Sequence, residues 1–411
     1  MEGNQRFKQS VGVLLALMVV LANYSPQMQQ LRAVPEAVNV RAGESYDLSL
    51  GWPFAVATSG EAQARASSDE TLGASGEMTL EVTLLGVPIK SVEVSIAPEK
   101  MLMPGGQSIG VALDTQGVLV VGTAGVGEED SPAQRAGLRE GDIILTVDGH
   151  EVKDTQHLSE LVAAKGGGML NLTYRRGGNT RVTTLQPATD KLDGQLRLGL
   201  WVRDSTAGVG TLSFYDPQTH KYGALGHAIS DIDTGVTLPV RDGSIYKSTV
   251  VGIRKGARGN PGELQGSFLR EEAVLGNIRL NNNYGIYGLA DAPFVNSLYP
   301  NGLPMASQAA VKTGKATILT TLDGEGVKAY EVEITRVAKQ NEAAQKSMTL
   351  RVTDPVLLEK TGGIVQGMSG SPIIQDGRIV GAVTHVFVND PTQGYGMYIE
   401  WMLEQAEKIR V

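Results

Sequence analysis

Short runs of alternating polar and apolar residues recur along most of the chain. Residues 77–85 and 90–96 both alternate, and Gly86-Val87-Pro88 between them marks a turn. Side chains of a β-strand point to opposite faces in turn, so this period of two predicts strands with one buried face. We expect a small β domain over residues 34–98, with a mobile Ala-, Ser-, Glu- and Gly-rich loop at residues 60–76.

The strand-like pattern continues through residues 190–411. This unit is too long for one barrel and suits two β-barrels with a site between them. A helix is expected near its end, at residues 400–409, with Trp401, Leu403 and Ile409 among its apolar positions. The expected strands are residues 209–214, 235–240, 247–253, 316–319, 327–334 and 347–352. The chain as a whole is therefore predicted to be mainly β.

Residues 101–187 form a second unit with a more specific pattern. The run Ala-Gly-Leu-x-x-Gly-Asp-Ile-Ile-x-x-Val-Asp-Gly occupies residues 136–149. A helical pattern follows at residues 155–164, and a final hairpin covers residues 170–185. Along its whole length this unit resembles a PDZ domain.

The PDZ resemblance implies that a peptide is captured by strand addition. We expect the ligand between the strand that starts at Ile109 and the helix that starts near Thr155. Backbone amides of Ser108, Ile109 and Gly110 would bind a terminal carboxylate, and Val111 would continue the strand. The alternative is a groove that packs against another domain and binds no free peptide.

The first 26 residues have the pattern of a targeting segment. Arg6 and Lys8 precede residues 11–22, which carry no charge. A basic start and an apolar run of this length are typical of a signal peptide and short for a membrane span of roughly 20 residues. Asn23-Tyr24-Ser25-Pro26 is a poor cleavage site, so a cleaved signal and an uncleaved anchor both stay open, with a buried helix as the third reading. A signal or an anchor would place the rest of the chain outside the cytoplasm.

Composition narrows the classes of function. The net charge of −8 argues against nucleic acid as the main partner. The absence of cysteine excludes thiol catalysis, disulfides and zinc held by cysteine. The chain also lacks a His-Glu-x-x-His motif, and we expect neither a metal nor another cofactor.

The strongest candidate chemistry lies in residues 361–372. The pattern Gly-x-Ser-Gly-Ser-Pro places Ser369 beside a glycine and ahead of a predicted hairpin. Glycines allow a tight turn that leaves a serine Oγ free to attack. The amides of Gly367 and Ser369 would point at the developing oxyanion. A Gly- and Ser-rich turn without chemistry is the alternative.

A nucleophilic serine needs a histidine base. His227 is the candidate because small residues flank it and because it precedes the serine and follows a predicted hairpin, which is the order of two-barrel serine peptidases. His385 lies on an apolar strand and is interpreted as a core residue.

Three aspartates are candidates for the acid that orients the base. Asp231 and Asp233 closely follow His227, but they fit equally well in a turn before Thr234-Gly235. Asp354 precedes a proline, where an aspartate often caps a helix or starts a turn. The pattern alone does not choose between them.

Several runs together resemble the SpoIVB peptidase family, the stage IV sporulation serine peptidases of spore-forming Firmicutes. The likeness covers the whole chain, from the apolar segment and the small β region to the PDZ and peptidase units. Position by position, it implies His227 as base, Ser369 as nucleophile and Asp354 as acid. The runs that carry it are residues 199–208, 223–235, 259–264, 284–288, 362–372 and 381–386.

The resemblance implies an exported or anchored serine endopeptidase that acts in sporulation signalling. Such an enzyme is made in the forespore, is exported to the space between forespore and mother cell, and processes itself near its N-terminus. It cleaves the membrane regulator SpoIVFA, which releases a membrane metalloprotease that activates a late sigma factor. The PDZ domain would guide self-recognition and substrate delivery.

Two other classes of function stay open. One is a catalytically inactive PDZ scaffold that binds peptide C-termini. The other is an esterase that uses the same serine and histidine. Against the esterase, the Gly-x-Ser-x-Gly elbow of α/β-hydrolases is not matched, because Ser371 stands where the second glycine would be.

Overall fold

The computed structural model describes residues 23–44, 48, 50–59, 76–269 and 274–410. The apolar run at residues 11–22 and nearly all of the loop expected at residues 60–76 lie outside the described residues. Within the described part, no helix is long and apolar enough to cross a bilayer. The chain divides into two compact units, residues 1–100 with 306–311, and residues 101–305 with 312–411.

The first unit is a four-stranded sheet with the order β1-β4-β3-β2. Strand β1 runs parallel to β4, and the other neighbours are antiparallel. The predicted alternation is confirmed in β4, where Val92 and Val94 are buried and Glu93 is exposed. The elements are α2 (Pro26–Ala33), β1 (Ala37–Arg41), β2 (Phe54–Ser59), β3 (Gly76–Leu84), β4 (Val87–Ala97) and η1 (Gln308–Ala310).

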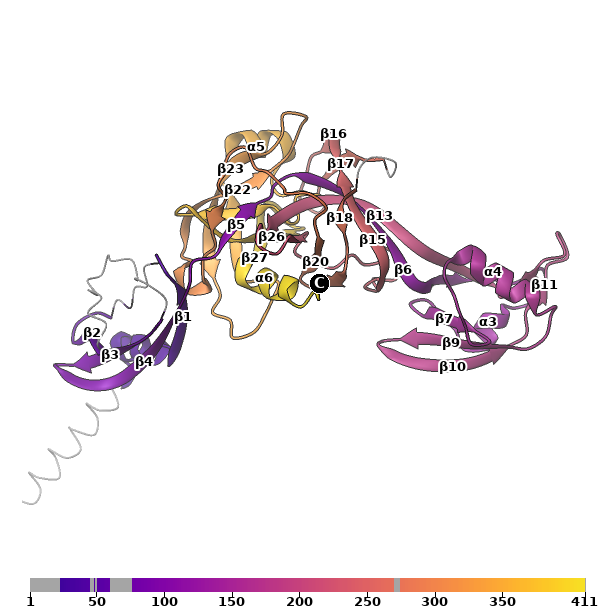
Figure 1. Cartoon of the computed structure of the whole chain (residues 1–411), viewed down its shortest axis with the longest axis horizontal. Coiled ribbons are helices and arrows are strands. Elements are labelled where there is room, and N and C mark those ends of the chain that lie inside the picture. Colours follow the sequence, from indigo (N-terminus) through magenta and orange to yellow (C-terminus); the bar gives the residue numbers. More distant parts are fainter. Residues whose placement is uncertain (1–22, 45–47, 49, 60–75, 270–273, 411) are drawn as a thin grey trace, which may run out of the picture. The chain divides into compact units, whose positions relative to one another are not determined.

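Two long strands organise the second unit. Strands β6 (Ser108–Thr123) and β13 (Leu200–Tyr215) pair antiparallel from Ser108↔Thr211 to Leu200↔Thr123 (Figure 1). At one end they complete the PDZ fold, and at the other they belong to the peptidase fold. The strand that closes the PDZ sheet therefore comes from beyond residue 187, where the sequence pattern placed the end of this domain.

The PDZ fold packs its helices against a small sheet with one apolar core. The predicted helix at residues 155–164 is confirmed as α4, which buries Leu158 and Val162. Its elements between the long strands are α3 (Pro132–Arg135), β7 (Ile143–Val147), β8 (His150–Glu151), α4 (Thr155–Ala164), β9 (Leu170–Arg176), β10 (Asn179–Leu185), β11 (Ala188–Thr189) and β12 (Leu196–Arg197).

The first half of the peptidase fold extends the sheet of the long strands. Its elements are β5 (Met101–Pro104), β14 (Lys221–Ala224), β15 (Val240–Lys247), β16 (Thr249–Arg254), β17 (Glu263–Ser267), β18 (Val274–Asn277), β19 (Leu280–Asn282), β20 (Gly285–Leu289) and β21 (Leu303–Pro304). The strand expected at residues 235–240 is wrong, because the Asp231 carboxylate accepts hydrogen bonds from Thr234 and holds a turn there. The strand expected at residues 247–253 is split at Ser248.

The second half is a closed barrel with the order β22-β23-β24-β27-β26-β25. The C-terminal helix α6 is confirmed at Ile399–Glu407 and buries Met402 and Leu403 against the adjoining core. The elements are β22 (Gly314–Thr320), β23 (Lys328–Val337), β24 (Met348–Val352), α5 (Pro355–Thr361), β25 (Pro372–Gln375), β26 (Arg378–Phe387), β27 (Asp390–Tyr398) and α6. The described part of the chain is thus mainly β, with a small sheet, a PDZ domain and a closed barrel.

A buried ion pair gives the aspartate of the PDZ motif, Asp142, a structural role. Asp142 is fully buried, and its two oxygens accept from Arg176 Nε at 2.6 Å and Nη2 at 2.6 Å. The Arg139 amide donates to the same carboxylate at 2.9 Å. A paired and hydrogen-bonded carboxylate is stable inside a protein, whereas an unpaired charge is not.

We predict that Asp142→Ala lowers the free energy of unfolding of the PDZ fold by about 3 kcal/mol, because it leaves the Arg176 guanidinium without its partner. Urea unfolding followed by circular dichroism measures the change. Asp130→Ala, at an exposed loop position of the same fold, is the control and should cost less than about 0.5 kcal/mol. Equal stabilities of the two variants would contradict the role of the pair.

Candidate active site

Ser369 lies in a tight turn between α5 and β25. Two positive backbone angles shape this turn, φ +93° at Gly367 and φ +97° at Gly370. A Cβ on Gly370 would lie 2.1 Å from the carbonyl oxygen of Thr211 and 2.6 Å from the amide of Leu225. The turn therefore needs glycine at this position for its conformation and for its close approach to another chain segment.

Thr211 on β13 holds the serine turn in place. Its amide donates to the Ser369 carbonyl at 3.1 Å, and its Oγ1 donates to the Gly367 carbonyl at 2.7 Å. The side chain of Thr211 is almost fully buried, so water competes little for these bonds. The role of Thr211 is not visible in the sequence, because a threonine within a strand carries no pattern of its own.

The amides of Gly367 and Ser369 have the properties expected of an oxyanion hole. Among the described residues, neither amide donates a hydrogen bond, whereas the neighbouring Gly370 amide donates to Val383 O at 2.7 Å. Gly367 and Ser369 are half-buried, so a ligand oxygen can reach their amides. Two free N–H groups beside a serine Oγ suit an oxygen that gains negative charge.

His227 follows β14 in a second tight turn. Leu225 and Gly226 both have positive φ angles, and the Leu225 amide donates to the Thr211 carbonyl at 3.2 Å. The Nδ1 of His227 lies 2.9 Å from the carbonyl oxygen of Ala228. Since a carbonyl can only accept, we assign the proton to Nδ1, which leaves the Nε2 lone pair available to a substrate or a nucleophile.

The local environment also adjusts the basicity of His227. Burial lowers the pKa of His227 below its ordinary 6.5, and the hydrogen bond to Ala228 opposes this shift in part. The ring is therefore neutral near pH 7, which is the state that a general base requires.

The serine turn and the histidine turn both contact Thr384 on β26. Ser369 Oγ donates to the Thr384 carbonyl at 3.1 Å, and the ring centroids of His227 and His385 are 5.5 Å apart. A Cβ on Gly226 would lie only 2.9 Å from Thr384 Cγ2. Two segments far apart in the sequence are thus brought to the same residue, although the hydroxyl proton is directed at the Thr384 carbonyl and not at the imidazole.

The environment of His385 differs from that of a core residue. It is half-buried beside His227, and among the described residues its buried Nδ1 has no hydrogen-bond partner. Burial, followed by the neighbouring His227 and Lys346, lowers the pKa of His385. The interpretation of His385 as a satisfied core residue is therefore wrong, and only the tertiary structure reveals its place beside His227.

Asp354 does not contact His227. Its Oδ1 accepts from the amides of Val356 and Leu357 at 2.9 Å each, and its Oδ2 accepts from the Glu331 amide at 3.2 Å. It is the N-cap of α5, which is one of the two roles that an aspartate before proline often has. The expectation of a direct Asp354–His227 contact is corrected accordingly.

Asp231 and Asp233 are also engaged elsewhere. Both carboxylates pair with Arg203, Asp233 through Nη2 at 2.9 Å. Asp231 in addition closes the turn at Thr234. Each of the three candidate acids thus has other partners, and the Ala228 carbonyl occupies the position on Nδ1 that a triad carboxylate would take.

Residues 108–111 do not form the peptide groove that the sequence predicted. Ile109 and Gly110 pair with Gly210 and Val209 of β13 on one edge, and with Lys247 and Tyr246 of β15 on the other. Because both edges of this part of β6 are occupied, Ser108, Ile109, Gly110 and Val111 offer no free edge for strand addition.

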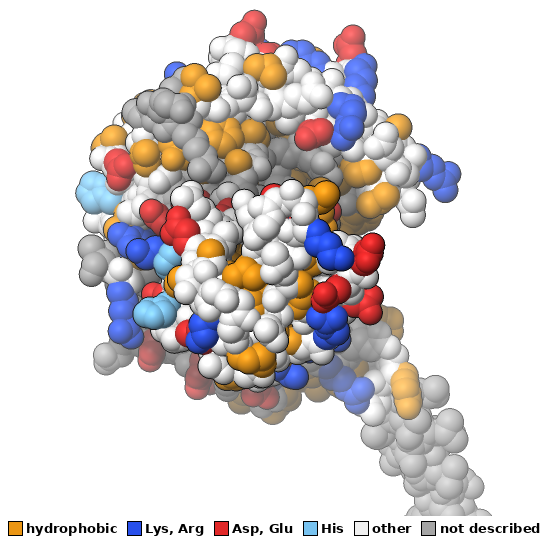
Figure 2. Space-filling model, turned by 90° about the vertical axis from the view of Figure 1, so that its right-hand side faces the viewer, with side chains coloured by type: hydrophobic (Ala, Val, Ile, Leu, Met, Phe, Trp, Pro, Cys, Tyr) orange, Lys and Arg blue, Asp and Glu red, His pale blue; other side chains and the backbone are white. Residues whose placement is uncertain are grey.

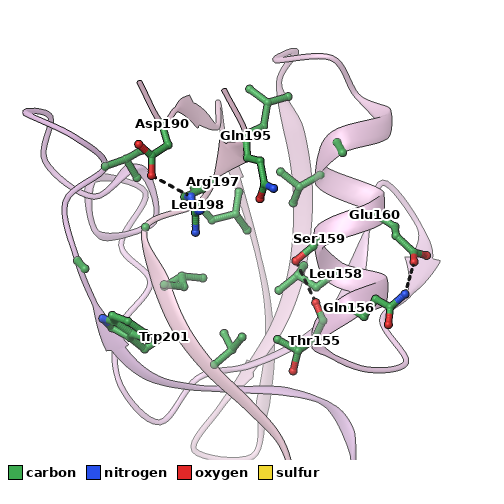
Figure 3. Close-up of a pocket in the computed structure, with 18 of the residues that line it drawn as sticks. Thr155, Gln156, Leu158, Ser159, Glu160, Asp190, Gln195, Arg197, Leu198 and Trp201 are labelled. Carbon is green, nitrogen blue, oxygen red and sulfur yellow. Dashed lines mark hydrogen bonds and ion pairs between the residues drawn. The ribbon is translucent and has the colours of Figure 1, made fainter. Parts of the chain in front are cut away.

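A groove does exist on the PDZ fold, between α4 and the start of β13 (Figure 3). It has a volume of about 920 Å³, and Leu158, Leu198 and Trp201 are among its lining residues. Trp201 is 66% exposed, and Arg197 at the margin pairs with Asp190 at 3.1 Å. On the face seen in Figure 2, acidic and basic side chains are interspersed with hydrophobic ones.

A protein-family model described as SpoIVB peptidase S55 matches residues 194–403, which is more than half of the 411 residues. A PDZ domain model matches residues 124–176. Among solved structures, the PDZ domain of the SdrC-like protein from Listeria monocytogenes is 26% identical, with a TM-score of 0.18, and the match covers 21% of this chain and 87% of that one. The active form of the Rv3671c protease from M. tuberculosis is 14% identical, with a TM-score of 0.28, and the match covers 62% of this chain and 87% of that one.

Two curated relatives match over shorter stretches. A protein of Neisseria meningitidis named "Putative zinc metalloprotease" is 36% identical over 66 residues, which are 16% of this chain and 15% of that protein. A protein of the same description from Brucella suis is 30% identical over 136 residues, 31% of this chain and 34% of that protein. The chain thus spans about a third or less of the length of these relatives. In the part of this chain that the structure describes, no group of three or more His, Asp or Glu side chains is arranged to hold a metal ion.

We predict that Asp354→Ala lowers the free energy of unfolding by about 1 kcal/mol, because two amides at the start of α5 lose their acceptor. Asp354→Ser, which keeps an acceptor at the N-cap, should cost only a few tenths of that. Glu359→Ala on the exposed side of the same helix is the control. Urea unfolding compares the three, and equal costs for Ala and Ser would show that Asp354 does not act as a cap.

Proposed function

Because the chain belongs to the SpoIVB peptidase S55 family, we propose that it is a serine endopeptidase in which Ser369 attacks the scissile carbonyl. One observation carries this proposal: the turns of Ser369 and His227 both contact Thr384 on β26. Nothing in the sequence of either turn predicts this shared contact. A serine that can reach an unprotonated imidazole nitrogen is the minimum for acyl transfer.

In the proposed reaction, the Ser369 hydroxyl leaves the Thr384 carbonyl and turns its proton to Nε2 of His227. The Oγ bonds to the substrate carbonyl carbon, and the oxygen that becomes negative accepts from the amides of Gly367 and Ser369. The C–N bond then breaks as His227 returns the proton to the leaving amine. Water attacks the acyl-enzyme by the same route in reverse order and frees Ser369.

The base works without a direct carboxylate partner in this scheme. The Ala228 carbonyl holds the Nδ1 proton and so selects the tautomer, which is one of the two tasks of a triad aspartate. Asp354 contributes to the site indirectly, as the N-cap of α5. The C-terminal end of this helix, at Gly362, leads into the turn of Gly367 and Ser369. The second task of a triad aspartate is to stabilise the imidazolium. In this scheme only the dipole of the Ala228 carbonyl does so.

For the substrate, we propose an extended protein segment, with the chain itself and a SpoIVFA-like membrane regulator as the two targets in sporulation signalling. The family resemblance supports this choice. The groove between α4 and β13 would hold a peptide C-terminus by strand addition to the edge of Leu200–Val202, because the other edge of this stretch pairs with β6.

For the location, we propose export across the forespore membrane, with the N-terminal segment as an anchor until processing. The uncharged residues 11–22 after Arg6 and Lys8 support this proposal. An inactive PDZ scaffold is the competing function, and the reactivity of Ser369 separates the two.

We predict that Ser369→Ala abolishes self-cleavage and labelling by a fluorophosphonate probe while the melting temperature stays within a few degrees of the parent. Loss of a nucleophile usually costs several powers of ten in rate. Ser371→Ala is the matched control, since its buried Oγ has no partner among the described residues and should keep cleavage and labelling. Self-cleavage by purified Ser369→Ala, with contaminating proteases excluded, would contradict the assignment of Ser369 as the nucleophile.

We also predict the acid limb of the pH profile. Because burial lowers the pKa of His227, kcat/KM should reach half of its plateau below pH 6.5 and fall as the pH drops further and protonates the base. Because a protonated His385 would repel a protonated His227, His385→Gln should leave the limb in place or raise its pH, but not lower it. A limb at or above pH 6.5 in the parent would contradict the assignment of the base.

A further inference from the structure

Several large apolar side chains are exposed to solvent at one end of the sheet in the first unit. Trp52 is 83% exposed, Leu85 74%, Val87 63% and Ile89 41%. We call these four residues the apolar tip. Single exposed apolar residues are common on soluble proteins. A group of them marks a surface that binds another protein or a membrane.

The strand register places the four residues at the same end. Strand β2 begins at Phe54, which pairs with Leu84, the last residue of β3. Leu84 also pairs with Val87, the first residue of β4 (Figure 1). Trp52 immediately precedes β2, and Leu85 forms the β3–β4 turn, so the tip combines the loop before β2 with the hairpin turn.

Charge is distributed unevenly between the two ends. Residues 50–55 and 83–89, which form the tip end, contain no charged residue, and the first charged residues along the sheet are Lys90, which pairs with Val82, and Glu81, which pairs with Ala57. The opposite end carries Glu77 near the start of β3 and Arg41 at the end of β1. A surface with no charge to desolvate and an exposed tryptophan suits the boundary between lipid headgroups and acyl chains.

The N-terminal part of the chain leads towards the same end. Strand β1 runs parallel to β4, with Ala37 beside Glu93, so residues before Ala37 continue in the direction of the hairpin turn. Lys90 Nζ donates to the Val34 carbonyl and ties this approach to β4. Leu31 of α2 and Leu84 both pack against the core of this unit. The uncharged residues 11–22 precede α2 by only a few positions.

We propose that the apolar tip lies against a lipid bilayer, the same bilayer that residues 11–22 enter. The proposal rests on the anchoring proposed above and is independent of the peptidase activity. An anchor that leaves the sheet at its tip end holds Trp52, Leu85, Val87 and Ile89 near the membrane surface, where burial of their side chains needs no protein partner.

Site-specific labelling tests the contact, because the chain has no cysteine and a single one can be introduced. Leu85→Cys in full-length Ser369→Ala carries the environment-sensitive dye NBD and is reconstituted into vesicles of phosphatidylethanolamine and phosphatidylglycerol. Val182→Cys on β10 of the PDZ fold is the matched control, since it is 69% exposed. Flotation of the vesicles reports anchoring separately.

We expect both proteins to float with the vesicles. The NBD emission of the Leu85 variant should shift to shorter wavelength, and aqueous iodide should quench it several-fold less than the Val182 variant. Flotation with equal quenching of the two labels would overturn the tip contact and leave anchoring intact. Failure to float would overturn both. Protection of the Leu85 label in lipid-free protein would assign the tip to a protein surface instead.

Discussion

One threonine connects the two halves of the candidate active site. Thr211 donates through its amide to Ser369 and through its hydroxyl to Gly367, and its carbonyl accepts from Leu225, two residues before His227. The three bonds use every polar atom of a nearly fully buried residue. The relative placement of the Ser369 and His227 turns therefore depends on one strand position, and a displacement of β13 at this point would move both turns.

The long pairing of β6 with β13 gives Thr211 its fixed place. Ser108 pairs with Thr211 near one end of the ladder, and Thr123 pairs with Leu200 at the other end, inside the PDZ fold. The strand that positions the serine turn is thus continuous with the strand that borders the PDZ groove. A peptide that adds to Leu200–Val202 would extend the same ladder, which provides a physical connection between the groove and the site within this unit.

The groups that face the His227 imidazole are electrically neutral. Asp354 caps a helix, and Asp231 and Asp233 pair with Arg203, so the imidazole of His227 faces the Ala228 carbonyl and a second imidazole. Two rings at this distance are not protonated together without mutual repulsion. In the proposed reaction, such a site favours a neutral His227 at the start and lacks part of the stabilisation that a carboxylate offers the imidazolium.

The sequence by itself determined the features that depend on neighbours along the chain. Alternation predicted two of the four strands of the small sheet, β3 and β4, helical spacing predicted α4 and α6, and glycines on both sides of Met368-Ser369 predicted a tight turn. The PDZ and peptidase resemblances also followed from local runs. Only the tertiary structure decided which distant segments meet. In the folded chain, residues 108–111 are paired on both edges, and the groove lies between α4 and β13. His385 lies beside His227, and Asp354 caps a helix. The sequence could not predict these outcomes, because strand pairing and the partner of a carboxylate depend on residues far away in the sequence.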